Sequence, residues 1–258
     1  MNNLDHAEKN FFAVGRYWGG LNASFRQKDA VCSMHTGVSI SDFNWVWNEK
    51  PLFAGSADAI EEIKEYYHNL NLRFWWWLYP RGDTPRTRDL LAAAGMDLIA
   101  QIPCMVADLD IKALEENIPA QITVSEVKSN KDLPLWADIS FRGFQMPERT
   151  RDEYNAFVLS FAQSNRRAQK LFLVYVDGNP AATSLLFTDK ETAGIYYVAT
   201  LPEFRNKGLG FHVTLAAMRA AKDAGHKKVI LQATPAGEKV YRRIGFQEIC
   251  RAQIYKLK

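Results

Sequence analysis

The sequence predicts a mixed α/β fold that contains two similar domains. Apolar runs of strand length alternate with stretches of helical periodicity along all 258 residues. The same order of elements recurs in the last third of each half, which indicates an internal repeat. Hydrophobic residues make up 47% and charged residues 24% of the chain, proportions that are typical of a globular protein.

Helices and strands of the first half follow from periodicity. Apolar residues at helical spacing predict helices over 7–25 and 57–69, with Ser56 as the N-cap of the second, and a short helix through 90–94 that ends at Gly95. Apolar and β-branched runs predict strands over 31–38, 42–47, 74–79 and 96–107. This half therefore ends in the order strand, short helix, glycine, strand.

The second half contains the same kinds of element. Strands are predicted over 122–127, 171–176, 181–187, 195–199, 229–233 and 246–257. Helices are predicted over 132–141, 151–163 and 208–224, with a short helix that ends at Ile244. Asp177-Gly-Asn-Pro180 is a hairpin signal between two of the strands.

The repeat aligns the two halves at residue level. Segment 74–80 corresponds to 229–235, and segment 91–96 corresponds to 241–246. The shared order of strand, proline, short helix, glycine and strand predicts two domains, at residues 1–118 and 119–258.

Composition and charge argue against several function classes. A net charge of +3 is too small to indicate nucleic-acid or membrane binding. The N-terminus has no apolar signal segment, and the longest apolar run, 74–79, is far shorter than the ~20 residues of a membrane helix. Cys32, Cys104 and Cys250 form no paired motif, which favours reduced thiols in a cytoplasmic protein. We expect no metal cofactor.

A glycine-containing loop joins the predicted strand 195–199 to the helix that follows it. Such a loop directs free backbone N–H groups and the positive end of the helix dipole toward one point, which suits a phosphate. The P-loop pattern is absent, and Gly208-Leu-Gly210 is followed by Val213 where a dinucleotide motif requires glycine. The pattern that is present is Arg205-x-x-Gly208-x-Gly210.

This pattern, followed by Tyr241-x-x-x-Gly245-Phe246, resembles the two signatures of the GNAT superfamily of acetyl-CoA-dependent N-acetyltransferases. The resemblance covers most of 119–258. It extends more weakly to tandem proteins in which a degenerate GNAT domain precedes an intact one. It implies that each domain is a mixed, mostly antiparallel sheet flanked by helices, and that the sheet splays at a bulge before the loop.

The resemblance also implies an acetyl-CoA site in the second domain. Exposed backbone groups of Val198 and Thr200 would pair with the pantetheine arm, and Thr234 would offer a hydroxyl where many members have Asn. Backbone amides of the loop would bind the pyrophosphate, and we expect unusual dihedral angles at both glycines. The loop residues assigned to this contact are Arg205, Asn206, Lys207, Gly208, Leu209 and Gly210.

Tyr241 is the expected catalytic residue, because the resemblance implies that its hydroxyl protonates the departing CoA thiolate. The competing interpretation is an aromatic side chain that only packs. An amine must be neutral to attack, so a base is also expected, and the residues considered are Glu191, Asp189 and Glu153, none of which the sequence singles out. His212 is expected to be an exposed bystander.

The function predicted for the chain is transfer of an acetyl group from acetyl-CoA to a primary amine by direct attack in a ternary complex. The acceptor, a small molecule or a peptide, is not identified, and the alternative is a non-catalytic acyl-CoA sensor. Solvent-exposed positions are expected for four cations, one of which is a candidate contact for the CoA 3′-phosphate: Lys227, Lys228, Arg242 and Arg243.

The first domain is not expected to bind CoA. Its loop over 48–57 has one glycine, and Pro51 removes a backbone donor. Asp58 in the first helical turn would repel a phosphate. Leu91 stands at the position of Tyr241 and has no proton to donate.

Overall fold

A computed structural model describes residues 1–165 and 167–258 and divides them into two compact units. The C-terminal unit comprises Met1–Phe11 and Cys104–Ile249. The N-terminal unit comprises Phe12–Pro103 and Cys250–Lys258. The first residues of the chain therefore belong to the C-terminal unit, and the last residues belong to the N-terminal unit. The domain boundary between residues 118 and 119 stays a prediction.

The N-terminal unit is built on a sheet in which only strands β3 and β4 are parallel. The sheet order is β1-β2-β3-β4-β11, and residues from Cys250 onward supply the β11 contribution. The elements that lie wholly or partly in this unit are α1 (Asn3–Leu21), β1 (Arg26–Lys28), β2 (Val31–His35), β3 (Asn44–Asn48), α2 (Ser56–Asn69), β4 (Trp75–Leu78), α3 (Pro85–Ala93), β5 (Met96–Asp108) and β11 (Gln247–Leu257).

The C-terminal unit has the sheet order β6-β7-β8-β9-β10-β5, in which β9 and β10 are the parallel pair. The part of β5 from Cys104 onward forms one side of this sheet. The remaining elements of the unit are β6 (Ile122–Glu126), α4 (Leu133–Gly143), α5 (Arg151–Ser160), β7 (Gln169–Val176), β8 (Asn179–Thr188), β9 (Ala193–Thr200), α6 (Leu209–Asp223), β10 (Lys228–Gln232) and α7 (Pro235–Ile244).

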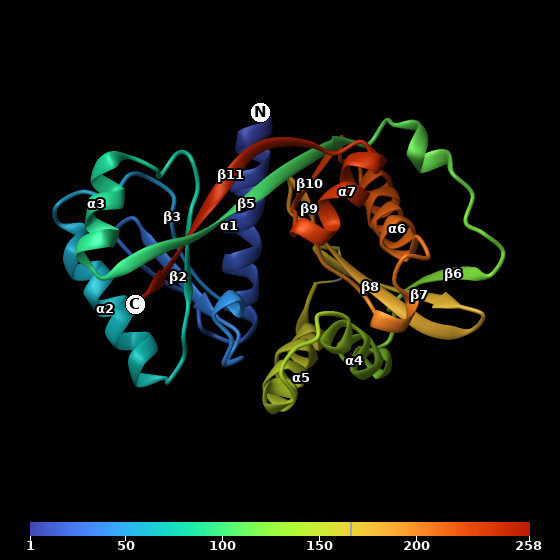
Figure 1. Cartoon of the computed structure of the whole chain (residues 1–258), viewed down its shortest axis with the longest axis horizontal. Coiled ribbons are helices and arrows are strands. Elements are labelled where there is room, and N and C mark those ends of the chain that lie inside the picture. Colours follow the sequence, from blue (N-terminus) through green and yellow to red (C-terminus); the bar gives the residue numbers. More distant parts are fainter. Residues whose placement is uncertain (166) are drawn as a thin grey trace. The chain divides into compact units, whose positions relative to one another are not determined.

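Helices cover both faces of the C-terminal sheet (Figure 1). Phe172 and Val174 of β7 pack in one core cluster with the apolar face of α6, which includes Val213 and Met218. Alternate residues of a strand point to opposite faces, and the indole of Trp136 on α4 donates hydrogen bonds to the carbonyls of Phe172 and Ser184, at 3.2 and 3.4 Å. The sheet is therefore buried between the pair α6 and α7 and the pair α4 and α5.

The mixed α/β class and the type of each predicted element are confirmed, whereas several bounds differ. Helix α1 begins at Asn3 and ends at Leu21, and the predicted helix 151–163 finishes as a 3₁₀ turn. The N-cap prediction for Ser56 is wrong, because Ser56 is the first helical residue and its hydroxyl accepts a hydrogen bond from the Phe53 N–H. Strand β1 escaped prediction because all its residues are polar and exposed. None of the described helices is long and apolar enough to cross a membrane.

The hairpin turn and the repeat both have a visible structural basis. Asp177 and Gly178 both have positive φ, at 49° and 79°, as a two-residue turn requires. Helices α3 and α7 both begin with a Thr-Pro pair, in which the hydroxyl of Thr84 or Thr234 accepts from the N–H three residues on. Both helices are followed by a glycine of positive φ. Leu91 and Tyr241 occupy the same position in the two helices.

Asn10 fastens the first residues of α1 to strand β9 within the C-terminal unit. Its amide oxygen accepts from the Tyr196 hydroxyl at 2.7 Å, and its amide nitrogen donates to Thr192 at 2.9 Å. A Cβ at position 194 would lie 2.0 Å from the Asn10 oxygen, so this position requires glycine. The C-terminal unit therefore includes the start of the chain.

Asn10→Ala should lower the free energy of unfolding by about 1–3 kcal/mol, because it removes the amide oxygen that accepts a hydrogen bond from the buried Tyr196 hydroxyl. Denaturant unfolding of the full chain measures this. Lys9→Ala is the control, since it removes an exposed ion pair with Glu191, and solvent-exposed pairs contribute little to stability. Equal effects of the two substitutions would contradict the role given to Asn10.

Candidate acetyl-CoA site

The loop between β9 and α6 presents a run of unused backbone donors. Within the described residues, Arg205 N–H bonds to the Pro202 carbonyl, and bonding resumes at Phe211 and His212, whose N–H groups both reach the Gly208 carbonyl. The N–H groups from Asn206 to Gly210 lie between these bonds and have no acceptor in that part of the chain. At the N-terminus of a 15-residue helix, these donors suit an anion.

Two left-handed residues shape this loop. Asn206 and Gly208 have φ of 64° and 77°, so their peptide groups turn successive N–H vectors toward the concave side, as in anion-binding nests. Gly208 is the N-cap of α6. Gly210 differs from expectation, because its φ is not positive and a Cβ there would meet no atom within 4 Å. Its role is therefore to leave space.

Strand β9 carries a bulge immediately before the loop. Tyr196 pairs with Leu185 and Ala199 pairs with Thr183, so Tyr197 and Val198 together oppose one residue of β8. Tyr197 has φ 52°, and its carbonyl accepts a hydrogen bond from the Thr183 hydroxyl at 3.1 Å. The bulge that the resemblance implied is present.

Beyond the bulge, β9 and β10 separate. Their single registered pair is Ile230 with Gly194, near the start of β9. Backbone groups of β9 on that side, including those of Val198 and Thr200, therefore have no β10 partner in the registered ladder. The resulting split opens toward the loop and toward α7, which begins just after β10.

Tyr241 lies on α7 in the core beside this split. It is 7% exposed, its ring lies 5.8 Å from that of Phe246, and its burial raises the pKa of the phenol. Its hydroxyl has no hydrogen-bond partner among the described residues. The Tyr241 hydroxyl is therefore available to bond to a ligand.

Arg205 and Thr234 take structural positions around the site. The Arg205 guanidinium donates to the Gly143 carbonyl at 2.9 Å and the Gln145 side chain at 3.2 Å, so it fastens the loop to the C-terminus of α4. The exposed Thr234 hydroxyl accepts from the Gly237 N–H at 3.2 Å and retains a proton to donate. Their contact with CoA stays a prediction.

The residues considered as bases have other partners. Glu191 forms an ion pair with Lys9 at 2.8 Å, and Asp189 accepts from the N–H groups of Glu191 and Thr192 in a turn. The expectation that His212 is exposed is wrong. Its side chain is among the buried residues of α6, and the exposed fraction of the residue is only 9%. Burial lowers the pKa of its imidazole, Glu116 opposes that shift, and Arg219 and Arg243 add to it.

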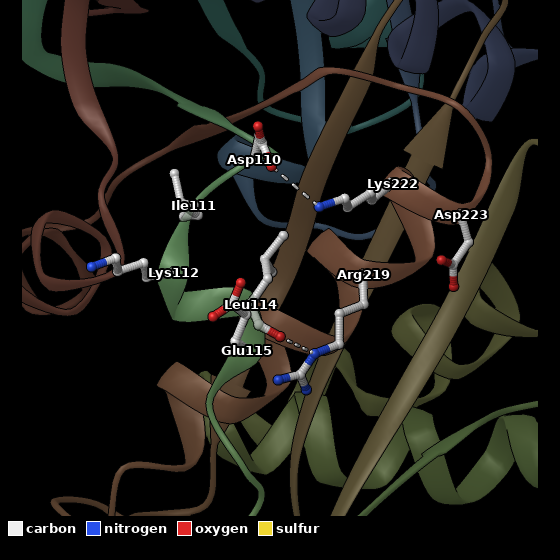
Figure 2. A pocket seen from close by; sticks show the side chains of 8 residues that line it. All are labelled: Asp110, Ile111, Lys112, Leu114, Glu115, Arg219, Lys222 and Asp223. Atoms are coloured by element: carbon white, nitrogen blue, oxygen red, sulfur yellow. Dashed lines mark hydrogen bonds and ion pairs between the residues drawn. The ribbon is translucent and has the colours of Figure 1, made fainter.

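A cavity of about 260 Å³ lies at the other end of α6, where Arg219 and Lys222 face the segment that connects β5 to β6 (Figure 2). Arg219 donates to the Leu114 carbonyl at 3.1 Å, and Lys222 pairs with Asp110 at 3.7 Å. Arg219 is about 14 Å along the helix from Gly210, at 1.5 Å per residue. Three cations and three carboxylates line this cavity, so it has no net charge to attract an anionic ligand.

The corresponding loop of the N-terminal unit lacks these features. Strands β3 and β4 keep three registered parallel pairs, from Trp45 with Trp75 to Trp47 with Trp77, so this sheet shows no split there. The N–H groups of Leu52, Phe53, Ser56 and Ala57 are all hydrogen-bonded within the unit. Leu91 is fully buried at the Tyr241 position.

Comparisons with known proteins agree with this geometry. Residues 133–246 match the family model described as "Acetyltransferase (GNAT) family". No curated protein matches the sequence significantly. A GCN5-related N-acetyltransferase from Kribbella flavida is 19% identical, with a TM-score of 0.73 over 97% of this chain and 95% of that chain.

Two further solved structures extend the likeness. A GCN5-related N-acetyltransferase from Sphaerobacter thermophilus is 17% identical, with a TM-score of 0.64 over 88% of this chain and 76% of that chain. A tandem GNAT protein from the clavulanic acid biosynthesis pathway is 12% identical, with a TM-score of 0.59 over 98% and 95% of the two chains. The whole chain thus has the fold of solved GCN5-related N-acetyltransferases, and residues 133–246 within it match the GNAT acetyltransferase family.

Proposed function

We propose that the C-terminal unit transfers an acetyl group from acetyl-CoA to a primary amine. The observation that carries this proposal is the conjunction of three features in one unit: the unused N–H groups of 206–210, the separation of β9 from β10, and the unpaired hydroxyl of Tyr241. The donors would bind the pyrophosphate. The split would admit the pantetheine arm between the two strands and direct it toward Tyr241.

Acetyl-CoA supplies an activated acetyl thioester, and residues of this chain would hold and cleave it. Val198 and Thr200 offer backbone groups on the open side of β9 that can pair with the amides of the arm. The amine nitrogen attacks the acetyl carbonyl and loses a proton to solvent, while the carbon–sulfur bond breaks with its electron pair on sulfur. Tyr241 gives its proton to that sulfur and regains one from solvent. The products are the acetylated amine and the CoA thiol.

The environment of Tyr241 suits an acid. A raised pKa keeps the phenol protonated throughout the neutral range. The same desolvation raises the pKa of a thiolate that forms beside it, so the proton affinities of donor and acceptor rise together. Because the hydroxyl has no competing acceptor among the described residues, it can bond to the leaving sulfur at no cost to the protein.

The test combines calorimetry with an acceptor screen. Acetyl-CoA should bind with one site per chain, because among the described residues the C-terminal unit combines a run of free N–H donors with separated strands, whereas the parallel strands of the N-terminal unit stay paired. Release of free CoA thiol should then depend on one of a panel of amines, amino acids, aminoglycosides and peptides. Two equivalent sites would contradict the assignment to one unit. Binding without thiol release for any acceptor would favour a non-catalytic acyl-CoA sensor.

A further inference from the structure

The cavity of about 260 Å³ beside the C-terminal half of α6 combines apolar side chains with side chains of both charges (Figure 2). The apolar part of its lining is Ile111 and Leu114, which are partly buried against the core cluster of the C-terminal unit. Three cations and three carboxylates complete the lining. All of these residues belong to the C-terminal unit. A ligand in this cavity would therefore contact apolar and charged groups together.

Arg219 is held in place and keeps donors for a ligand. Its Nε and Nη2 groups donate to the carbonyls of Leu114 and Glu116, at 3.1 and 2.7 Å. Both acceptors are backbone carbonyls, so no ion pair within the described residues neutralises the guanidinium. A guanidinium has five N–H groups, and those of Nη1 make no hydrogen bond in that part of the chain. Arg219 thus presents a charged donor in a position that the backbone fixes.

Asp223 follows Arg219 by one turn on the same face of α6 and carries the opposite charge. Opposite charges at this spacing commonly pair on a helix surface, since their Cβ atoms are about 5–6 Å apart. The structure records no pair between them, because the Arg219 guanidinium is directed to the two carbonyls. Glu115 likewise makes no ion pair within the described residues. The cavity therefore keeps a cation and carboxylates close together without mutual neutralisation.

Lys222 supplies a second cation to the same cavity. It forms an ion pair with Asp110 at 3.7 Å, in which the Asp110 side chain is fully exposed (Figure 2). An exposed pair of this length contributes little free energy. Lys222 can therefore exchange Asp110 for the carboxylate of a ligand at little cost.

The balance of charge decides which class of ligand fits. An anion attracted to Arg219 would be repelled by Asp223 and Glu115, and a cation would meet the reverse. A zwitterion gains from both sets if its two charges are close together, as they are in an α-amino acid. The cavity volume of about 260 Å³ lies just below the range of about 300–1,000 Å³ that drug-sized ligands occupy, which suits so small a molecule.

We propose that this cavity binds a free α-amino acid with an apolar side chain. The carboxylate of the amino acid bonds to Nη1 of Arg219 and pairs with Lys222. Its ammonium pairs with Asp223 and Glu115, and its side chain contacts the apolar part of the lining. Arg219 lies about 14 Å along α6 from Gly210, so this site is separate from the proposed acetyl-CoA site and does not depend on it.

The experiment titrates the full chain with L-leucine and three analogues by calorimetry. L-Leucine should bind with a Kd of roughly 0.1–1 mM, the affinity expected of a ligand with so few atoms. Leucinamide lacks the carboxylate, 4-methylpentanoate lacks the ammonium, and glycine lacks the apolar side chain. Each analogue should bind about tenfold more weakly or worse. Absence of leucine binding, or equal binding of leucine and either singly charged analogue, would overturn the proposal.

Two substitutions locate the binding site. Asp223→Asn should weaken leucine binding about tenfold and should not weaken 4-methylpentanoate, which has no ammonium. Lys222→Gln should weaken leucine and should not weaken leucinamide, which has no carboxylate. Asp152→Asn is the control, because Asp152 is an exposed carboxylate of α5 outside the cavity.

The outcome is independent of the proposed function. All three variants should bind acetyl-CoA as the wild type does, since none of them changes the phosphate loop or the split between β9 and β10. If leucine binds equally to the wild type and to the Asp223 and Lys222 variants, it binds elsewhere in the chain and the cavity is not its site.

Discussion

Tyr241→Phe should lower kcat by about 10²-fold or more, within the usual contribution of general acid catalysis. The Kd for acetyl-CoA should stay within about twofold of the wild type, because the residues expected to bind the pyrophosphate lie in the 206–210 loop. Burial raises the pKa of the phenol, so the acid remains protonated as the pH rises, and kcat should show no loss from phenol ionisation up to pH values near 10.

This substitution is a clean test because it removes only an oxygen without a partner. The ring keeps its packing with Phe246, and no described donor or acceptor loses a hydrogen bond. The melting temperature should therefore not fall. The control is Tyr175→Phe, because Tyr175 is a half-exposed residue of β7 with no assigned role. This variant should have the kcat of the wild type. Near-normal turnover of Tyr241→Phe would reduce Tyr241 to a packing residue.

Local patterns in the sequence were enough to predict the order of elements and the position of the glycine loop between a strand and a helix. The strand, glycine loop and helix around Gly208, and the Thr-Pro start of α7, depend on contacts between residues that are close in sequence. The alignment of Leu91 with Tyr241 succeeded for the same reason. Both helices have the same length between a proline at N1 and a left-handed glycine.

Features that depend on pairing between distant segments could not be derived from the residues themselves, and the bulge and the splayed sheet were expected only from the family resemblance. The bulge at Tyr197 is defined only by its register against β8, and the divergence of β9 from β10 only by the single pair at Gly194. The role of Asn10 could not be predicted from its place in a helix, because it depends on the hydrogen bond from Tyr196, which is remote in sequence. His212 is buried because of tertiary packing around α6, although its position in the first turn suggested exposure.

The Arg205 guanidinium shows the same limit within the motif itself. Its side chain donates to the Gly143 carbonyl and Gln145, two contacts that the sequence pattern did not predict. Gly143 is itself constrained, since a Cβ there would lie 2.9 Å from the Ala199 side chain. The loop is therefore held close to α4 by contacts that involve residues about 60 positions apart in the chain.

Gly210→Asp should abolish measurable binding of acetyl-CoA. The new carboxylate would stand among the N–H donors of 206–210, where it would both occupy the helix N-terminus and repel the pyrophosphate. Two like charges about 4 Å apart repel each other by roughly 1 kcal/mol in bulk water and roughly 4 kcal/mol near a protein surface. Because the pyrophosphate carries two charges, a loss of 10²-fold or more in affinity follows at 1.4 kcal/mol per factor of ten.

Gly210→Ala separates charge from bulk in this experiment. The Gly210 backbone does not need a left-handed conformation, and an added Cβ meets no atom within 4 Å, so both substitutions should fold. Aspartate near a helix N-terminus should even favour the fold slightly. Calorimetry should therefore find that Gly210→Ala binds acetyl-CoA within a few-fold of the wild type while Gly210→Asp does not bind. If Gly210→Asp kept wild-type affinity, the pyrophosphate would have to bind elsewhere, because no anion could share the 206–210 donors with that carboxylate.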